Sequence, residues 1–246
     1  MATYDKVAKQ YSDSMTDTGD FYHRTQIDPS VYRIIGDPKG KTIYDLGCGN
    51  GYIARNLARK GAKVFASDVS SELVKLAKEK GKDLDINYSV RGALDFNGFN
   101  DNQFDVVVIN MVIHYIKDLD TLFKGIGRIL NKRGLFVFST NHPFRPSYPY
   151  SDWEVGKIND EEVLFIKATG YLKEEVRNGV CWCDSKTKLV MYNQPLNLLV
   201  NTMAKRGLYT FQVEEPESDG FAHRFSKKLQ KSHHIPTFII LGAKKI

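Results

Sequence analysis

The stretch Lys41–Leu46, KTIYDL, runs directly into the glycine-rich turn Gly47-Cys48-Gly49-Asn50-Gly51. A helical pattern begins at Tyr52 and ends at Gly61. A short strand, a glycine turn and a helix in this order are typical of the first unit of a parallel α/β sheet. Glycines let the chain turn sharply and let a ligand approach the backbone. The first turn of the helix adds N–H groups that have no partner within the helix. The stretch therefore predicts a ligand site at a strand end.

Two acidic residues indicate the kind of ligand. Position 52 is Tyr, so the dinucleotide-binding pattern G-x-G-x-x-G fails at its third glycine. Asp45 lies just before the turn, where it disfavours a phosphate and favours an ammonium or sulfonium group. Asp68 ends a predicted strand, 63–67, and is placed to accept hydrogen bonds from ribose hydroxyls. The alternative for Asp68 is a helix cap, which Ser70 already provides.

Strands and helices alternate through the first 140 residues. Residues 104–110, FDVVVIN, are nearly all apolar, as in a central parallel strand buried on both faces. Residues 208–214 and 237–243 are expected to pair as antiparallel strands at one sheet edge. The other predicted strands cover 41–46, 63–67, 86–90 and 135–140, and the predicted helices cover 3–15, 29–36, 52–60, 70–80, 118–130 and 195–206. The pattern predicts an α/β fold: a Rossmann-like, seven-stranded, mostly parallel sheet with an antiparallel edge strand and helices on both faces.

The length of 246 residues fits a single domain, 1–246. Residues 1–36 are expected to form a helical lid. Residues 141–193 interrupt the alternation and are expected to form an inserted cap after the fifth strand, because such insertions tend to build substrate sites. Within it, 141–160 reads as a loop, and 163–177 and 187–193 read as two antiparallel strands.

The composition limits the partners, metal ions and cellular location that we expect for the protein. The net charge is +6, but the basic residues are scattered, so we do not expect a nucleic-acid partner. No apolar run is long enough to span a membrane, and the N-terminus lacks the apolar segment of a signal peptide. The three cysteines do not form a disulfide framework, and Cys181 and Cys183 are poorly spaced for zinc. We expect a cytoplasmic protein with no metal and no membrane partner. The sequence carries no signal for the oligomeric state.

Several motifs, in order, resemble those of the class I S-adenosylmethionine-dependent methyltransferases of the small-molecule, methyltransferase-11 or UbiE-like type. The resemblance covers most of the chain and implies S-adenosylmethionine (SAM) as the cofactor. The stretches that carry it are YDLGCGNGYIARNLA, VFASDVS, the run from Asn100 to His142-Pro143, and YNQPLNLLVNTMAKRGLYTFQVEEP.

The resemblance implies roles for particular residues. Asp45 would lie near the methionine amino group, the glycine turn would back the methionyl and ribose parts, and Asp68 would bind the ribose. An acidic residue that often holds the adenine is replaced here by Gly92 or Ala93, and Asn193-Gln194 replaces a frequent His-Arg pair. The residues expected to contact the cofactor are Asp45, Gly47, Cys48, Gly49, Gly51, Asp68, Val69, Ala93, Leu94, Asn110 and Tyr11.

Methyl transfer is an in-line displacement, so much of the catalysis can come from holding the acceptor close to the methyl group. A base is needed only if the acceptor must lose a proton. His114 follows the predicted strand 104–110, and His142 follows the predicted strand 135–140. We expect either histidine to act as base or to orient the acceptor. The alternatives are a packed histidine at position 114 and a structural His-Pro turn at position 142.

The small-molecule acceptor is expected to contact Tyr22 and His23 of the lid and Tyr148 and Tyr171 of the insertion, although interior packing explains such aromatic residues equally well. The sequence thus favours a methyltransferase that acts on an O or N atom of a small molecule. The alternatives are an RNA methyltransferase such as a tRNA enzyme, a SAM-binding protein without catalysis, and an NAD-binding oxidoreductase, which the missing third glycine disfavours.

Overall fold

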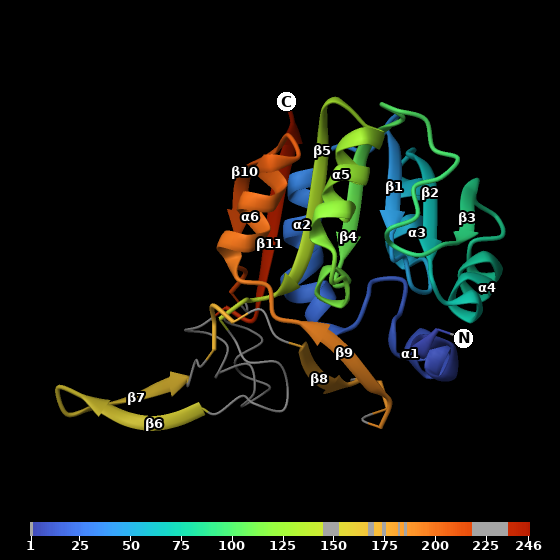
Figure 1. The fold of residues 1–246 in the computed structure, drawn as a ribbon. Helices are drawn as coiled ribbons and strands as arrows, with labels where there is room; N and C mark the ends of the chain where they lie inside the picture. Colours follow the sequence, from blue (N-terminus) through green and yellow to red (C-terminus); the bar gives the residue numbers. More distant parts are fainter. Residues whose placement is uncertain are drawn as a thin grey trace.

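The computed structural model describes residues 2–144, 153–166, 170–173, 176–181, 183–184, 186–217 and 236–246. A seven-stranded sheet forms its centre, with the strand order β10-β11-β5-β4-β1-β2-β3 (Figure 1). Its strands are β1 (Thr42–Leu46), β2 (Lys63–Asp68), β3 (Ile86–Val90), β4 (Phe104–Asn110), β5 (Leu130–Asn141), β10 (Leu208–Glu214) and β11 (Phe238–Lys245).

The pairing of the strands confirms the predicted fold class. All neighbouring pairs in the sheet are parallel except those that β11 makes with β5 and with β10. The antiparallel pair β10 and β11 thus forms one edge of the sheet, as the sequence predicts. No helix in the described ranges is long and apolar enough to span a bilayer.

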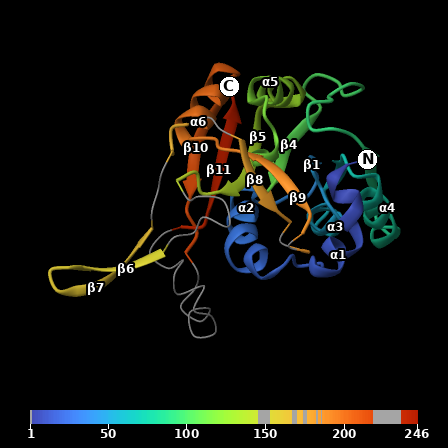
Figure 2. The ribbon, with the colours of Figure 1, turned by 60° about the horizontal axis from the view of Figure 1, so that its bottom comes forward.

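Helices cover both faces of the sheet (Figures 1 and 2). One face carries α2 (Asp28–Ile35), α3 (Tyr52–Arg59) and α4 (Ser71–Lys80), and the other carries α5 (Leu119–Ile129) and α6 (Leu196–Lys205). The apolar run in β4 explains this arrangement, because its side chains alternate between the two faces. Val107 and Ile109 join the core beneath α5 and α6, while Val106 and Val108 join the core beneath α2 and α3.

The carboxyl ends of the parallel strands meet at one edge of the sheet, the lower edge in Figure 1. The short helix α1 (Ala8–Ser14) and the hairpin of β8 (Val176–Val180) and β9 (Lys188–Tyr192) lie below this edge. Ligands of open α/β sheets bind at this edge. The N-terminal segment and the insertion therefore both approach the place where a site is expected.

The N-terminal segment consists of η1 (Thr3–Val7), α1 and η2 (His23–Ile27), and it is tied to the glycine turn through α3. The fully buried side chain of Arg55 donates to the Asn50 carbonyl oxygen at 2.6 Å and to Asp17 Oδ1 at 2.5 Å. Asn50 Nδ2 donates in turn to the carbonyl oxygen of Met15 at 2.8 Å. These contacts hold the segment against the sheet edge. Its role as a lid stays a prediction.

The insertion differs from its prediction. It contains two hairpins, one of β6 (Trp153–Ile158) with β7 (Glu161–Ile166), and one of β8 with β9. The expected loop over 141–160 is therefore wrong for β6, and the expected single strand over 163–177 is interrupted at 170–173. The missed signal is Asn159-Asp160, whose φ angles of +50° and +64° make a two-residue hairpin turn. Asn and Asp adopt this left-handed conformation more readily than most residues. The β6–β7 hairpin extends away from the body (Figure 2).

Candidate cofactor and acceptor site

The glycine turn is enclosed by the protein itself. Gly47 and Gly49 have φ angles of +79° and +56°, a region that side chains disfavour. A Cβ atom at Gly47 would lie 2.6 Å from the side chain of Val112, in the loop after β4. A Cβ atom at Gly49 would lie 2.9 Å from the hydroxyl oxygen of Tyr11, on α1. Both glycines are therefore required by the fold. Gly51 likewise faces another part of the fold, because its Cβ would lie 2.6 Å from the Tyr88 hydroxyl.

Asp45 carries an unpaired, buried carboxylate oxygen. The backbone N–H of Ala54 in α3 favours the charged form of this carboxylate. Its Oδ2 atom has no hydrogen-bond partner among the described residues. Burial, reinforced by the negative charge of Asp68, raises the pKa of Asp45 to about 7. Buried polar atoms in proteins are nearly always paired, so Oδ2 is suited to a ligand donor such as an ammonium group.

Asp68 lies at the end of β2 and joins the glycine turn to α4. Its Oδ2 atom accepts the Gly49 N–H at 3.0 Å, and its Oδ1 atom accepts the Ser70 N–H at 2.9 Å. Burial raises the pKa of this carboxyl group. The Ser70 side chain caps α4 by accepting the Leu73 N–H at 3.2 Å, so Asp68 is not needed as the helix cap. Each Asp68 oxygen keeps a second lone pair for a ligand hydroxyl.

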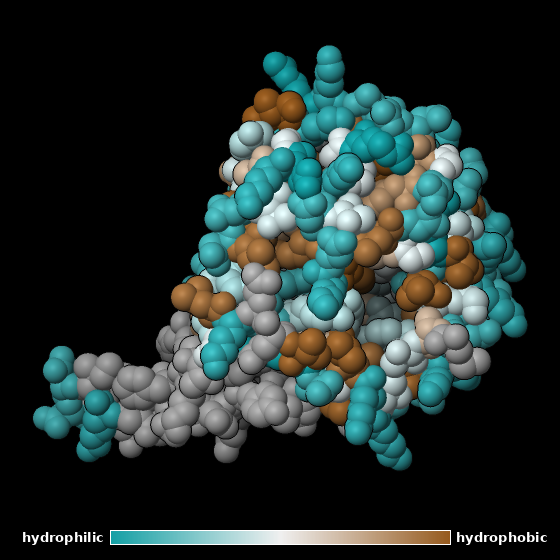
Figure 3. All heavy atoms as spheres, viewed as in Figure 1, coloured by the Kyte–Doolittle hydropathy of each residue, from teal (hydrophilic) through white to brown (hydrophobic). Residues whose placement is uncertain are grey.

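An apolar rim is formed at the carboxyl ends of β2 and β3 and in the segments that follow them. It consists of Val69, Val90 and Leu94, whose exposed fractions are 58%, 56% and 40%. Asp68 faces Val90 across the β2–β3 pair, which places Val69 and Val90 close together. In the described part of the chain, the N–H groups of Ala93 and Leu94 donate to no acceptor. In the space-filling view, apolar residues gather around a recess at the height of the strand ends (Figure 3). An apolar rim with free N–H donors fits a heteroaromatic ring such as adenine.

Two expected cofactor residues turn their side chains into the protein. Cys48 packs in the core beneath α2 and α3, where burial raises its thiol pKa. Asn110 Nδ2 donates to Asp28 Oδ1 at 3.2 Å and to the Tyr52 hydroxyl at 2.9 Å. The Asn110 Oδ1 atom accepts the Ser139 hydroxyl. Any contact of Cys48 with the cofactor would therefore involve its backbone, and the amide of Asn110 is already engaged by protein groups.

An aromatic cluster joins the N-terminal segment to the loop after β4. The ring of Tyr4 packs edge-on against Tyr11 and Tyr115, with centroids 5.6 and 6.1 Å apart. The hydroxyl groups of Tyr4 and Tyr115 lie 3.1 Å apart. Burial raises the pKa of Tyr4 and of Tyr11, so both rings are neutral. Neutral aromatic faces near the glycine turn are compatible with a cationic ligand.

A pocket that we name the acceptor pocket, after the role proposed for it below, lies along the same edge, where the loop after β4, the end of β5 and the β8–β9 hairpin meet. It brings the two candidate catalytic histidines, His114 and His142, onto one cavity. None of the described residues that line it is acidic. They are His114, Thr140, Asn141, His142, Pro143, Arg177, Met191, Tyr192, Asn193 and Gln194.

The two histidines differ in their surroundings. His114 lies in η3 (Ile113–Tyr115), and its Nδ1 atom lies 3.2 Å from Thr140 Oγ1. Burial lowers its pKa to about 4, so the imidazole is neutral at pH 7. The described residues form no hydrogen bond to its Nε2 atom. His142 Nε2 lies 2.7 Å from Glu215 Oε1, and the His142 backbone N–H donates to the Thr237 carbonyl oxygen.

Three of the four residues expected to bind the acceptor, Tyr22, His23 and Tyr171, are not among the described residues that line this pocket. Tyr22 packs against Phe238, and His23 Nδ1 lies 2.8 Å from Asp20 Oδ1. The hydroxyl of Tyr171 accepts the Leu196 N–H at 3.2 Å, at the start of α6. Tyr148 lies outside the described residues. Their roles at the acceptor stay predictions.

Four lining residues of the pocket carry no signal that sequence reasoning could use. Thr140 and Arg177 lie in ordinary strand stretches, and Asn193-Gln194 stands out only as a departure from a family pattern. Asn193 Nδ2 donates to three backbone carbonyl oxygens in the range 170–173 and so holds the insertion in place.

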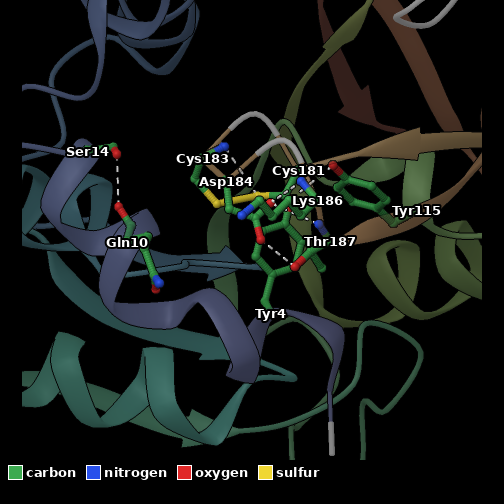
Figure 4. Close-up of a disulfide and its surroundings, with 9 residues drawn as sticks. All are labelled: Tyr4, Gln10, Ser14, Tyr115, Cys181, Cys183, Asp184, Lys186 and Thr187. Atoms are coloured by element: carbon green, nitrogen blue, oxygen red, sulfur yellow. Dashed lines mark hydrogen bonds between the residues drawn. A yellow bond between two sulfur atoms is a disulfide. The ribbon is translucent and has the colours of Figure 1, made fainter.

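A disulfide joins Cys181 and Cys183 at the end of the β8–β9 hairpin, which their spacing did not predict (Figure 4). It packs near Tyr4 and Tyr115. With Asp184, the two sulfurs form the one close group of three potential metal ligands among the described residues. That group is already engaged, because the sulfurs are bonded together and the Asp184 carboxylate accepts two backbone N–H groups. Disulfides are rare in the cytoplasm. The cytoplasmic location therefore stays a prediction.

Comparisons with known proteins agree with this geometry. Residues 44–138 match the family model described as a methyltransferase domain. The chain is 25% identical over 230 residues to an uncharacterised protein of Haemophilus influenzae, covering 89% of this chain and 86% of that one. It is 30% identical over 106 residues to a ubiquinone biosynthesis O-methyltransferase of Xanthomonas oryzae. That match covers 42% of this chain and only 44% of the Xanthomonas enzyme.

A solved structure extends the likeness to nearly the whole chain. It is that of an S-adenosylmethionine-dependent methyltransferase from Mesorhizobium loti, with a TM-score of 0.75 and 26% sequence identity. The superposition covers 88% of this chain and 96% of that one. The domain match and the shared fold show that the chain carries a methyltransferase domain with the fold of the S-adenosylmethionine-dependent methyltransferases.

Proposed function

We propose that the protein transfers a methyl group from SAM to an O or N atom of a small-molecule acceptor. The observation that carries the proposal is the buried, unpaired Oδ2 atom of Asp45, which lies at the same sheet edge as a pocket that contains two histidines. The first feature suits the cationic end of an amino-acid cofactor. The second suits a neutral molecule that offers a nucleophilic lone pair.

The cofactor side divides into three parts. The Asp45 carboxylate pairs with the ammonium group, and Asp68 accepts hydrogen bonds from the ribose hydroxyls. The apolar rim covers the adenine ring, and the N–H groups of Ala93 and Leu94 donate to it. When bound, SAM supplies a methyl group already activated by the positive sulfur.

The acceptor side orients the nucleophile and can remove its proton. When the proton of His114 is on Nδ1 and is donated to Thr140 Oγ1, its Nε2 atom carries a lone pair. That lone pair can take a proton from a hydroxyl or a protonated amine as the new bond forms. Because the pKa of His114 is about 4, it is a weak base, and we expect orientation to supply much of the rate. His142 is the alternative base, paired with Glu215.

The choice of a small molecule over RNA rests on the pocket. RNA recognition requires an extended basic surface or splayed bases stacked on aromatic side chains. Among the described lining residues, Arg177 is the one residue with a permanent positive charge. A pocket lined mainly by neutral polar groups fits a small molecule better. A SAM-binding protein without catalysis would have no use for two histidines on one cavity.

Two measurements test the proposal. Isothermal titration should detect binding of S-adenosylhomocysteine and no binding of NAD. Radiolabelled SAM should then transfer its methyl group to members of a panel of phenols and amines, and not to tRNA. Binding of NAD without S-adenosylhomocysteine, or labelling of tRNA alone, would replace the proposal with one of its rivals.

A further inference from the structure

Gln194 lies between β9 and α6, and it has two properties that the proposed function leaves unexplained. It is 7% exposed and lines the acceptor pocket. Its Nε2 atom donates to the carbonyl oxygens of Ile113 and Ile116, at 3.2 and 2.7 Å. Those two residues flank His114 and Tyr115 on η3. Gln194 therefore clamps both ends of the turn that carries His114.

The same two hydrogen bonds fix the orientation of the Gln194 amide. Reversing it would place the side-chain oxygen against two carbonyl oxygens, and all three are acceptors only. The side-chain oxygen Oε1 therefore faces away from η3. It is buried, and it has no hydrogen-bond partner among the described residues. The neighbouring amide of Asn193 is used differently, because it holds the chain at 170–173.

We infer that Gln194 determines which acceptors the pocket takes: its Oε1 atom accepts a hydrogen bond from a hydroxyl or N–H group of the acceptor, while its Nε2 atom positions the His114 turn. This inference rests on the proposed function, because it assumes that the pocket receives the acceptor. The acceptor class is a small molecule with a hydrogen-bond donor at the methylated atom or next to it. Ethers and tertiary amines, which have no donor there, are rejected because they would leave a buried oxygen unpaired.

The experiment uses matched probes on the full chain saturated with S-adenosylhomocysteine. Phenol and anisole share a ring, but only phenol can donate; aniline and N,N-dimethylaniline form the corresponding nitrogen pair. Affinities are measured by titrations monitored by ligand NMR. The affinity for phenol should be about tenfold higher than the affinity for anisole, which is the factor expected for one buried hydrogen bond. Crystals soaked with phenol should place its oxygen within hydrogen-bond distance of Gln194 Oε1.

The variant Gln194→Met keeps the length of the side chain and removes both polar atoms. Its phenol-to-anisole affinity ratio should fall to about one, because no acceptor is left to discriminate between the probes. Its affinity for S-adenosylhomocysteine should not change. The matched control is Gln103→Met, because Gln103 lies just before β4, at the opposite end of the sheet. That control should keep the ratio of the wild type.

Three results would overturn the inference: equal binding of phenol and anisole to the wild type, a preference that survives in Gln194→Met, or soaked crystals with no phenol in the pocket. The soaks and the wild-type titration decide the question even if Gln194→Met does not fold. Failure of the proposed function is separately visible, because the protein would then either not bind S-adenosylhomocysteine or transfer the labelled methyl group to tRNA alone.

Discussion

The two halves of the sheet edge differ in charge. The cofactor half, at the ends of β1, β2 and β3, presents the carboxylates of Asp45 and Asp68. The acceptor pocket, at the ends of β4 and β5, presents His114, His142 and Gln194, and the structure describes no acidic residue in its lining. A cation is therefore attracted to one half, while a nucleophile on the other half keeps its lone pair available. Substitutions in the two halves should thus affect binding and turnover separately.

The largest effect is expected at Asp68. Asp68→Ala removes the proposed acceptor of the ribose hydroxyls. The expected loss is about 2–3 kcal/mol, or roughly 100-fold in affinity for S-adenosylhomocysteine by calorimetry. Asp101→Ala is the control, because Asp101 is an exposed residue that pairs with Arg128 away from the site. If the Asp68→Ala protein is folded and binds S-adenosylhomocysteine as tightly as the wild type, the ribose does not bind at Asp68.

The complementary change lies in the acceptor half. His114→Ala should lower turnover by about 100-fold, because it removes the group that orients the acceptor and can take its proton. Its affinity for S-adenosylhomocysteine should stay unchanged, since His114 lies in the acceptor half. Steady-state kinetics on an acceptor found with the panel, together with calorimetry, measure both quantities. If only His142→Ala loses activity, the role belongs to His142. A loss of cofactor affinity in His114→Ala would show that His114 also contributes to cofactor binding, so that the two halves are not separate.

A smaller effect is expected from pH. Only the ionised form of Asp45 pairs with an ammonium group, and its pKa is about 7. Affinity for S-adenosylhomocysteine should therefore fall as the pH falls through 7, by about tenfold between pH 8 and pH 6. Calorimetry across this range, with Asp45→Asn as the control, measures the slope. A wild-type affinity as flat as that of the control would show that Asp45 does not meet the ammonium group.

The smallest effect concerns the stability of the ligand-free protein. Because the pKa of Asp45 is raised on folding, the folded state holds a proton that the unfolded state loses above about pH 4. The protein is thus destabilised as the pH rises from about 4 to 7. Asp45→Asn should raise the melting temperature at pH 8 and leave it nearly unchanged at pH 4. A lower melting temperature at pH 8 would mean that the charge of Asp45 is already compensated.

The same comparison explains what the sequence could predict. Asp45, the glycine turn and Asp68 lie within 24 consecutive residues and follow a strand–turn–helix pattern with known geometry, so local reasoning placed them. Local reasoning could not show that Gly51 faces Tyr88 or that Asn110 is engaged by Asp28, because those contacts join distant elements.

The acceptor pocket was harder to predict for the same reason. Its lining comes from the loop after β4, the end of β5, and β8 and β9, and only the packed sheet brings these together. The positions of His114 and His142 after strands were visible in the sequence. The hydrogen bonds that turn the Gln194 oxygen away from η3 depend on two backbone carbonyl groups about 80 residues earlier, which no sequence pattern encodes. The β6–β7 hairpin was missed because Asn-Asp is a weaker turn signal than Asn-Gly.

The most direct test of the two-half site is a crystal structure with S-adenosylhomocysteine. The amino group should lie against Asp45 Oδ2, the ribose hydroxyls against Asp68, and the adenine ring on Val69, Val90 and Leu94. The sulfur should face the pocket that contains His114 and Gln194. A molecule bound elsewhere, or one whose sulfur faces away from that pocket, would contradict the assignment of the cofactor and acceptor halves.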